Sequence, residues 1–397
     1  MATMFFLPKL LDRMMQRGSA CAKFDADPSS SIRELHMELT YSCNCKCIMC
    51  DLWSKNINDP KLRNSEMTLE QIRSVIEESE SLKNINCVVL SGGEPFIWPS
   101  IVELCAFLTD KFPSARINFL TNGINSRLVL DKLDQILRTR PVGSIQLGSS
   151  IDGIGETHDR IRGIPHAFEK LVGTIKEVKK RHPGISYGLN FTLTPRNYRD
   201  LVKCYDFAEE IGCDFCAQFV VQWDVEEEFV WEKAQFDEIR AMTRSISGRI
   251  IEKYKKKNGW YFFPENLDIG LLAQIYYWSH LTDYAEKPKR YFDRCTAGRT
   301  FVQINPYGDV YFCPLLKKRV IGNLKERGLD EIWMSPAAQR LRHFIDSKGC
   351  HCWLVCTVFP MAGEALTCAM NASPKRLALL ERRMRDKYRK LTRRSSQ

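Results

Sequence analysis

The chain has 397 residues, 44% of them hydrophobic, which is enough to bury a full core and to form two domains with tails. Its net charge of +10 is typical of nucleic-acid-binding proteins, but the segment from Lys375 to Gln397 holds ten Lys or Arg and only two acidic residues. The remainder of the chain therefore carries a net charge of only +2, which argues against nucleic acid as a partner. The sequence contains no run of about 18 apolar residues, so no transmembrane helix is predicted.

The cysteine content points to metal-bound thiolates. The chain has 16 cysteines, with four between Cys43 and Cys50 and six from Cys295 onward. A disulfide framework would require an oxidising compartment, yet the N-terminus lacks an apolar signal region with a small-residue cleavage site. We therefore expect a cytoplasmic protein whose cysteines bind metal.

Residues 1–30 are expected to form an amphipathic N-terminal segment. Apolar residues from Phe5 to Met15 suggest a helix that is interrupted near Pro8. This pattern favours packing on the barrel or on a partner protein, and a membrane surface is the weaker alternative.

Between residues 31 and 223 the sequence alternates between strand and helix patterns. One helix is expected after Thr68, where Gln71 completes a capping box. Strand-like runs occur at 34–40, 87–90, 117–120, 144–147, 187–193 and 215–221. Parallel strands joined by helices close toward a barrel that carries its chemistry at the carboxyl ends of the strands. We therefore predict an α/β fold, an incomplete (β/α)6 TIM-type barrel.

The first predicted strand leads directly into a cysteine-rich octet, residues 43–50. Cys43, Cys47 and Cys50 have C-x3-C-x2-C spacing. Three thiolates in this arrangement can hold three irons of a [4Fe-4S] cluster and leave the fourth iron without a protein ligand. A structural zinc site with Cys45 as its fourth ligand is the alternative.

Three further motifs follow the predicted strands in order. Gly92-Gly93-Glu94-Pro95 comes after the second strand, and the segments 149–153 (SSIDG) and 158–163 (HDRIRG) come at and after the end of the fourth. Together with the octet, they resemble the radical S-adenosylmethionine (SAM) superfamily, whose fold is also an incomplete barrel. Met49 departs from this family, which usually has a bulky or aromatic residue against the adenine of SAM. Methionine is apolar and adaptable, so we expect the contact to survive.

The resemblance implies how SAM would be bound and cleaved. SAM would chelate the open iron, and one low-potential electron, from a donor such as flavodoxin or ferredoxin, would yield a 5'-deoxyadenosyl radical that removes a hydrogen atom from the substrate. Gly92 and Gly93 would let the backbone approach SAM. Glu94, followed by Pro95, would bind the ammonium group of SAM.

Several polar residues near the strand ends are weaker candidates. Ser150 and Asp152 are placed to meet the ribose hydroxyls of SAM, and Arg162 to meet its carboxylate. For each of them a loop-capping role is equally open. Asn122 either borders the SAM site or is simply part of an Asn-Gly turn.

The rest of the chain divides into three expected segments. Residues 224–290 form an aromatic-rich helical linker, for which core packing is favoured over the wall of a substrate cavity. Residues 291–370 form a small α+β domain that contains a hairpin, with strands at 300–304 and 310–312. Residues 371–397 form a basic, solvated helix.

The small domain carries a second set of cysteines. Cys295, Cys313 and the group Cys350, Cys352 and Cys356 resemble a SPASM or shorter twitch extension. The resemblance implies an auxiliary [4Fe-4S] cluster, and we assign it to Cys295, Cys313, Cys352 and Cys356, with Cys350 as the substitute ligand. The alternatives are a second auxiliary cluster, to which Cys368 would belong, and zinc.

The function that these motifs imply is that of a radical SAM oxidoreductase. The auxiliary cluster would accept the electron left on the substrate radical. The expected substrate is a peptide or protein side chain. The alternative is radical dehydrogenation or epimerisation of a small molecule such as a sugar, an aminocyclitol or a lipid precursor. A non-catalytic iron-sulfur or zinc scaffold is also open, although the intact octet and GGEP motif argue against it.

Overall fold

The computed structural model describes residues 8, 11–16, 18, 32–221, 229–258, 268–293, 295–347 and 349–371. The chain forms two compact units. The first unit contains Met1–Phe24, Lys233–Cys295 and Lys348–Gln397, and the second contains Asp25–Glu232 and Thr296–Ser347. The predicted basic helix after residue 371 lies outside the described residues. No helix in the described part of the chain is both long enough and apolar enough to cross a membrane.

The second unit is built on one nine-stranded sheet with the order β6-β5-β4-β3-β2-β1-β7-β8-β9. Strands β1 to β6 pair in parallel, as predicted. Their bounds are β1 Glu34–Thr40, β2 Cys87–Gly92, β3 Arg116–Thr121, β4 Ile145–Ser150, β5 Ser186–Leu193 and β6 Asp214–Phe219. Because the sheet ends at β6 and β9, it is an incomplete barrel, which confirms the predicted fold class.

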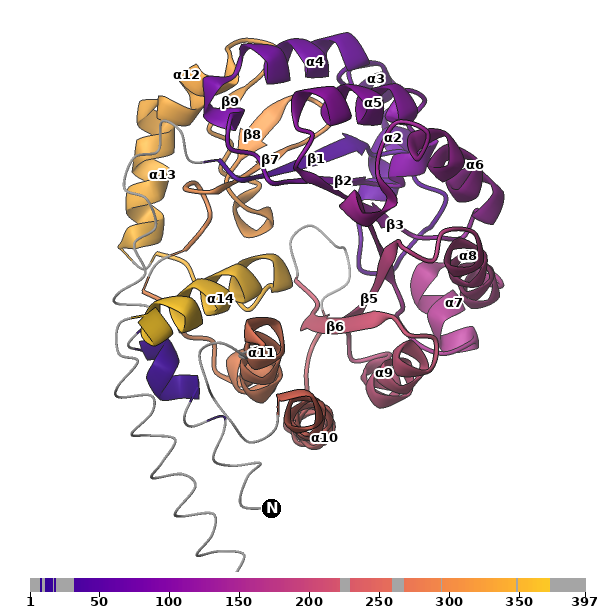
Figure 1. The fold of residues 1–397 in the computed structure, drawn as a ribbon, viewed down its shortest axis with the longest axis vertical. Coiled ribbons are helices and arrows are strands. Elements are labelled where there is room, and N and C mark those ends of the chain that lie inside the picture. The colour runs from indigo at the N-terminus through magenta and orange to yellow at the C-terminus, as the bar shows by residue number, and fades with distance from the viewer. Residues whose placement is uncertain are drawn as a thin grey trace, which may run out of the picture. The chain divides into compact units, whose positions relative to one another are not determined.

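The sheet is curved and is covered by helices along its outer side (Figure 1). The helices of this unit are α2 Leu52–Asn58, α3 Pro60–Asn64, α4 Leu69–Glu78, α5 Ile101–Lys111, α6 Ser126–Ile136, α7 Glu156–Arg162, α8 Ala167–Arg181, α9 Leu201–Glu210, α12 Leu329–Met334 and α13 Pro336–Asp346. The capping box predicted at Thr68 and Gln71 starts α4. One side of the strands supplies buried apolar residues such as Leu147, Leu189 and Phe191.

The hairpin of the C-terminal region extends this same sheet. Strands β7 (Phe301–Ile304) and β8 (Asp309–Tyr311) are antiparallel, as predicted, and β9 (Gly322–Asn323) pairs with β8. In addition, β7 pairs in parallel with β1. The half-buried carboxylate of Glu38 on β1 accepts hydrogen bonds from the hydroxyl of Tyr311 at 2.9 Å and from the amide of Gln303 at 3.1 Å, which ties the hairpin to the first strand.

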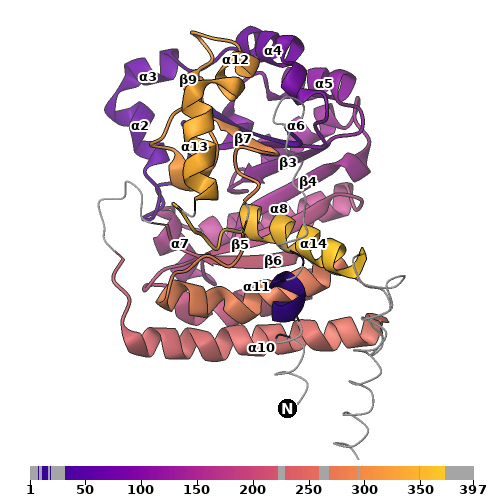
Figure 2. The ribbon, with the colours of Figure 1, turned by 90° about the vertical axis from the view of Figure 1, so that its left-hand side faces the viewer.

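The first unit consists mainly of three long helices, α10 (Lys233–Asn258), α11 (Ile269–Glu286) and α14 (Val355–Asn371). Helices α10 and α11 lie side by side (Figure 2), and they meet through the hydroxyl pair of Thr243 and Thr282 at 3.1 Å. Within this unit, Leu11, Met14 and Met15 of the N-terminal segment are buried. This burial agrees with an amphipathic segment that packs on the protein.

Candidate active site

The cysteine octet lies in a loop at the carboxyl edge of the sheet. It begins three residues after β1 ends, and the GGEP motif lies at the end of β2. Asn122 follows β3, and Asp152 follows β4. The carboxyl ends of parallel strands share one edge, so the fold brings these four positions to the same edge, as the sequence predicted.

The two glycines of the GGEP motif fit against the chain that leads into the octet. The amide of Gly93 donates to the carbonyl of Thr40 at 2.7 Å, and the amide of Glu94 donates to the carbonyl of Ser42 at 2.9 Å. A Cβ atom on Gly92, where φ is +120°, would lie 2.3 Å from the Thr40 carbonyl oxygen, and one on Gly93 would lie 2.4 Å from that of Ser42. Glycine is therefore required here for contact between β1 and β2, whatever its role toward SAM.

Glu94 is buried and holds the ends of β2 and β3 together. Its carboxylate accepts hydrogen bonds from the amide of Phe96 at 3.1 Å, the hydroxyl of Thr121 at 2.9 Å and the amide of Asn122 at 2.8 Å. Burial raises the pKa of Glu94 to about 7, although these donors oppose the rise. Most of the accepting capacity of the carboxylate is used in this way. Its predicted contact with the SAM ammonium group stays a prediction.

Asn122 joins the end of β3 to the octet. Its side-chain amide donates to Asn44 Oδ1 at 2.6 Å and lies 3.8 Å from the sulfur of Cys43. The residue is therefore part of the octet's support as well as of a turn.

Helix α7 supports the octet from the other side. The amides of Lys46 and Ile48 each donate at 3.0 Å, to the carbonyls of Arg162 and Ile161. Gly163, which ends the helix with φ at +66°, lies so close that a Cβ atom would be 2.4 Å from the Lys46 carbonyl oxygen. The last turn of an α-helix has carbonyls without helical partners, and here the octet satisfies two of them.

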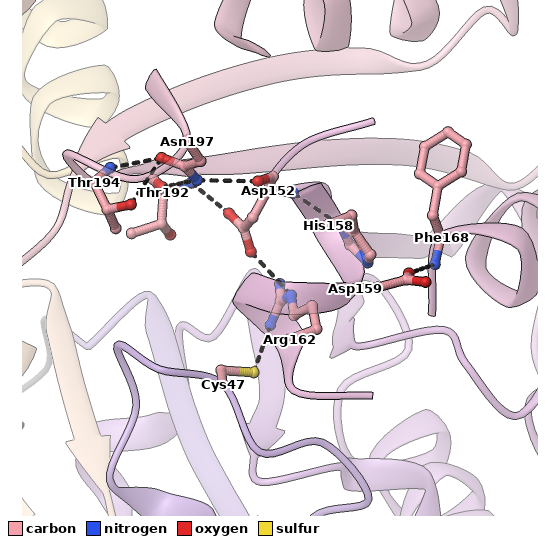
Figure 3. Close-up of polar contacts among 9 residues, drawn as sticks. All are labelled: Cys47, Asp152, His158, Asp159, Arg162, Phe168, Thr192, Thr194 and Asn197. Carbon is pink, nitrogen blue, oxygen red and sulfur yellow. Dashed lines mark hydrogen bonds and ion pairs between the residues drawn. The ribbon is translucent and has the colours of Figure 1, made fainter. Parts of the chain in front are cut away.

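Arg162 and Asp152 form a buried ion pair beside Cys47. Arg162 Nε lies 2.9 Å from Asp152 Oδ2, and Arg162 Nη1 lies 3.2 Å from Cys47 Sγ (Figure 3). Burial raises the pKa of the Asp152 carboxyl, although Arg162 opposes the rise. Burial alone would lower the pKa of Arg162, but Asp152 and Cys47 raise it. The two residues predicted to contact the ribose and the carboxylate of SAM therefore contact each other.

The remaining predicted SAM contacts lie near this edge. Met49 belongs to the octet, and Ser150 is the last residue of β4; both are half-buried. The third guanidinium nitrogen, Arg162 Nη2, is buried and has no hydrogen-bond partner among the described residues. It can still serve as a donor to an anionic group.

The thiols of the octet have unequal acidities. Hydrogen bonds from Cys45 lower the pKa values of Cys43 and Cys47, that of Cys47 to about 6, and the same bonds raise the pKa of Cys45. Burial raises the pKa of Cys50 to about 12. Because Cys45 donates to the other two sulfurs, it is the least suited of the four to be a thiolate ligand.

The donor set fits a cluster that is held by three cysteines. Nowhere in the described ranges do three His, Cys, Asp or Glu side chains form a group arranged to hold one metal ion. A structural zinc site would need four ligands around one ion. A [4Fe-4S] cluster instead takes each thiolate on a different iron, so its ligands need not converge on one point. Cys43, Cys47 and Cys50 could therefore hold such a cluster.

Comparison with known proteins identifies the chain. The family model of the radical SAM superfamily matches residues 37–208, which include the octet, the GGEP motif and α7. The chain belongs to the radical SAM superfamily. A second model, of an iron-sulfur cluster-binding domain named SPASM, matches residues 295–357. The cofactors of this radical SAM chain are thus SAM, a [4Fe-4S] cluster and auxiliary iron-sulfur in the SPASM domain.

The relatives of this radical SAM chain are named for different products. The AdoMet-dependent heme synthase of Methanosarcina barkeri is 26% identical over 80% of this chain and 86% of its own length. The mycofactocin maturase MftC of Mycobacterium ulcerans is 25% identical over 80% of this chain and 78% of its own. The structure of Streptococcus suis SuiB bound to SAM matches with a TM-score of 0.55 at 17% identity, over 79% of this chain and 68% of SuiB, and shows a shared fold. SuiB has also been solved with its precursor peptide SuiA.

The predicted auxiliary ligands are distributed over both units of the radical SAM chain. Cys295, Cys350, Cys352 and Cys356 belong to the first unit, and Cys313 follows β8 in the second. The assignment of these residues as ligands stays a prediction. Cys368 on α14 is disulfide-bonded, so in this state its sulfur is not a thiolate that could ligate a further cluster.

A cluster of aromatic rings surrounds Trp353, which lies between Cys352 and Cys356. The indole amide of Trp353 donates to the carbonyl of Tyr277 at 3.2 Å, and the Tyr277 hydroxyl donates to the carbonyl of Trp353 at 3.3 Å. The ring centroid of Tyr291 lies 4.7 Å away. The tryptophan and Tyr277 are buried, so Tyr277 of the predicted linker packs with Trp353 in a core of the first unit.

Proposed function

We propose that this chain binds a [4Fe-4S] cluster through Cys43, Cys47 and Cys50, reductively cleaves SAM at it, and thereby abstracts a hydrogen atom from a substrate. The observation that carries the proposal is the backbone support of the octet: α7 accepts two of its amides at 3.0 Å, and the GGEP motif holds the chain that leads into it at 2.7 and 2.9 Å. A loop held by backbone hydrogen bonds presents its thiols in one arrangement. When bound and reduced, the cluster supplies the electron that converts SAM to methionine and a 5'-deoxyadenosyl radical.

The residues of this chain bind and orient the cofactors. Met49 would contact the adenine, Ser150 would bind the ribose hydroxyls, and Arg162 would donate through Nη2 to the carboxylate of SAM. The backbone of Gly92 to Pro95 would bind on the side of the amino group. Support for these roles comes from the position of all these residues at the carboxyl edge of the sheet. A low-potential donor such as flavodoxin or ferredoxin supplies the electron.

Cys295, Cys313, Cys352 and Cys356, with Cys350 as the substitute, would hold an auxiliary cluster. Such a cluster would supply an acceptor for the electron that remains on the substrate after hydrogen abstraction, which would make the net reaction an oxidation. The match to an iron-sulfur cluster-binding domain over residues 295–357 supports this role, because it spans all five cysteines.

The proposed substrate is a peptide or protein side chain. Similarity to the maturase MftC and a fold shared with SuiB, which has been solved with a precursor peptide, support this class. A tetrapyrrole is the second candidate, because the heme synthase of M. barkeri is similar over 86% of its own length. A small sugar, aminocyclitol or lipid precursor, the other class expected from the sequence, has no such support.

Isotope transfer tests the proposed substrate. Peptides uniformly deuterated at carbon, including any encoded beside this chain, are incubated anaerobically with loaded protein, SAM and dithionite. A peptide substrate would transfer deuterium into 5'-deoxyadenosine, detected by mass spectrometry. Transfer from a deuterated tetrapyrrole and from none of the peptides would overturn the peptide assignment. The Cys47→Ala variant, which lacks a ligand, is the control for transfer that does not depend on the cluster.

A further inference from the structure

Arg162 contacts a sulfur of the octet directly. Its Nη1 atom lies 3.2 Å from Cys47 Sγ, within the distance of a hydrogen bond to sulfur. The guanidinium is always charged and presents its donors in a rigid fork. A second nitrogen, Nε, pairs with Asp152 at 2.9 Å, so one planar group bridges a carboxylate and a thiol.

Asp152, the partner of Arg162, is itself fixed by hydrogen bonds with three residues. Asp152 Oδ1 accepts from the amide of Thr192 on β5 at 2.8 Å, and its carbonyl accepts from the side chain of Asn197 at 3.0 Å (Figure 3). Its amide donates to Nδ1 of His158 on α7 at 3.0 Å. Each of these atoms holds Asp152 in place. Asp152 therefore holds the guanidinium in a fixed position instead of leaving it free to rotate away from the sulfur.

The backbone of Arg162 is fixed on the same loop that its side chain contacts. The carbonyl of Arg162 accepts from the amide of Lys46, and that of Ile161 accepts from the amide of Ile48. These two amides flank Cys47 in the sequence. The backbone and the side chain of Arg162 thus both hold the segment around Cys47.

The geometry points to Arg162 as a positioning residue that donates to the sulfur of Cys47 and sets the reduction potential of the cluster bound there. This inference rests on the proposed function, because it requires a cluster on Cys47. Hydrogen bonds to cluster sulfurs are among the protein's main means of tuning such potentials. One-electron reduction makes the cluster more negative, so a fixed positive donor stabilises the reduced form and raises the potential.

Redox titration of the full chain tests the inference. The part of the reduced EPR signal that changes on addition of SAM identifies the cluster with the open iron, and its midpoint is then measured without SAM. Arg162→Gln should make reduction about tenfold less favourable, a shift of about 59 mV to more negative potential for a one-electron couple. Arg162→Lys, which keeps the charge but lacks the fork, should shift the midpoint in the same direction by less.

A matched control lies two residues away. Arg160 is on the same helix but is exposed, so Arg160→Gln removes the same charge without touching the sulfur and should leave the midpoint unchanged. Wild-type midpoints in both Arg162 variants would overturn the inference. Failure of the wild-type chain to bind a cluster or to cleave SAM would instead refute the proposed function.

A measurement on the unmodified sequence covers the case in which a variant does not fold. Protein labelled with ¹⁵N-arginine and reduced without SAM should show a weak ¹⁵N hyperfine coupling in pulsed EPR of the same cluster. The coupling should be absent in labelled Arg162→Lys if that variant folds. Absence of the coupling from the labelled wild-type chain would overturn the inference, whatever the variants show.

Discussion

Gly93 and the carbonyl of Ser42 are in contact without room for a side chain. A Cβ atom at residue 93 would lie 2.4 Å from the carbonyl oxygen, and the neighbouring amide of Glu94 donates to the same oxygen at 2.9 Å. Gly93→Ala should therefore push the two strand ends apart and lower the free energy of unfolding by about 1–3 kcal/mol. Urea unfolding of anaerobically prepared protein measures this loss.

The control for this prediction is Gly173→Ala, at an exposed position of α8. A Cβ atom there would meet no heavy atom within 4 Å. Alanine in a helix is favoured over glycine, so this variant should be more stable than wild type by about 0.5–1 kcal/mol. Equal effects of the two substitutions would show that the contact between Gly93 and Ser42 is not required.

His158 makes the stability of the fold depend on pH. Burial lowers the pKa of its imidazole to about 3, and Nδ1 accepts from the amide of Asp152, so the folded chain holds the neutral ring. The unfolded chain binds a proton near its ordinary pKa of about 6.5, so stability is fully present above that pH and falls as pH drops toward 3.

The loss of stability that His158 causes at low pH has a defined size. Below about pH 6.5 the wild-type chain should lose up to about 1.4 kcal/mol per pH unit from this group. His158→Gln should be less stable at pH 7.5 but should lack this component of the pH dependence between 7.5 and 5.5. Urea unfolding at both values measures it. If the free energy of unfolding falls by the same amount between pH 7.5 and 5.5 in both proteins, the pH dependence does not come from His158.

At the scale of elements, α7 and the octet form one structural pair. Gly163 ends the helix at φ +66°, a conformation that costs alanine about 1–2 kcal/mol, and the Lys46 carbonyl occupies the place of a Cβ atom. Gly163→Ala should therefore loosen the octet. The expected result is faster loss of iron from the cluster to a chelator, followed by its visible absorbance.

Thr68→Ala separates this local effect from general destabilisation. It removes the side-chain cap of α4, which donates nothing to the octet, at a cost of about 1 kcal/mol. Iron loss should stay at the wild-type rate in this variant. If both variants lose iron equally fast, the contact between α7 and the octet is not what retains the cluster.

The sequence predicted the elements better than their contacts. Six parallel strands follow from apolar runs of the right length, and the motifs lie where strands end, because both signals are local. The pairing of β7 with β1 joins residues more than 260 positions apart and leaves no periodic signal. Likewise, Arg162 and Asp152 were predicted at the edge, but their ion pair with each other is a tertiary contact, which the spacing of residues in a single sequence does not encode.

At the scale of the whole molecule, the cysteines fall into two predicted groups that should load iron independently. The wild-type chain should hold about eight irons, Cys313→Ala about four, and Cys105→Ala, at a buried cysteine of α5 outside both groups, about eight. Iron and zinc analysis of anaerobically reconstituted protein measures this. About four irons with zinc would contradict the auxiliary cluster, and about twelve would indicate a second one.

Two features of the whole chain could not be predicted from the sequence patterns. The aromatic residues between Trp260 and Phe292 gave no period that distinguishes a cavity wall from a core, and only the packing on Trp353 shows that Tyr276 and Tyr277 belong to a core. The division of the predicted auxiliary cysteines between two units was equally hidden, because compact units are defined by contacts and not by order along the chain.

Release of 5'-deoxyadenosine is the most direct measurement of the central claim, that Cys43, Cys47 and Cys50 hold a cluster that cleaves SAM. Anaerobically reconstituted wild-type protein, incubated with SAM and dithionite, should release it even without substrate, whereas Cys47→Ala should release none. Release by Cys47→Ala at the wild-type rate, or none from a wild-type chain with a reduced cluster, would contradict the claim.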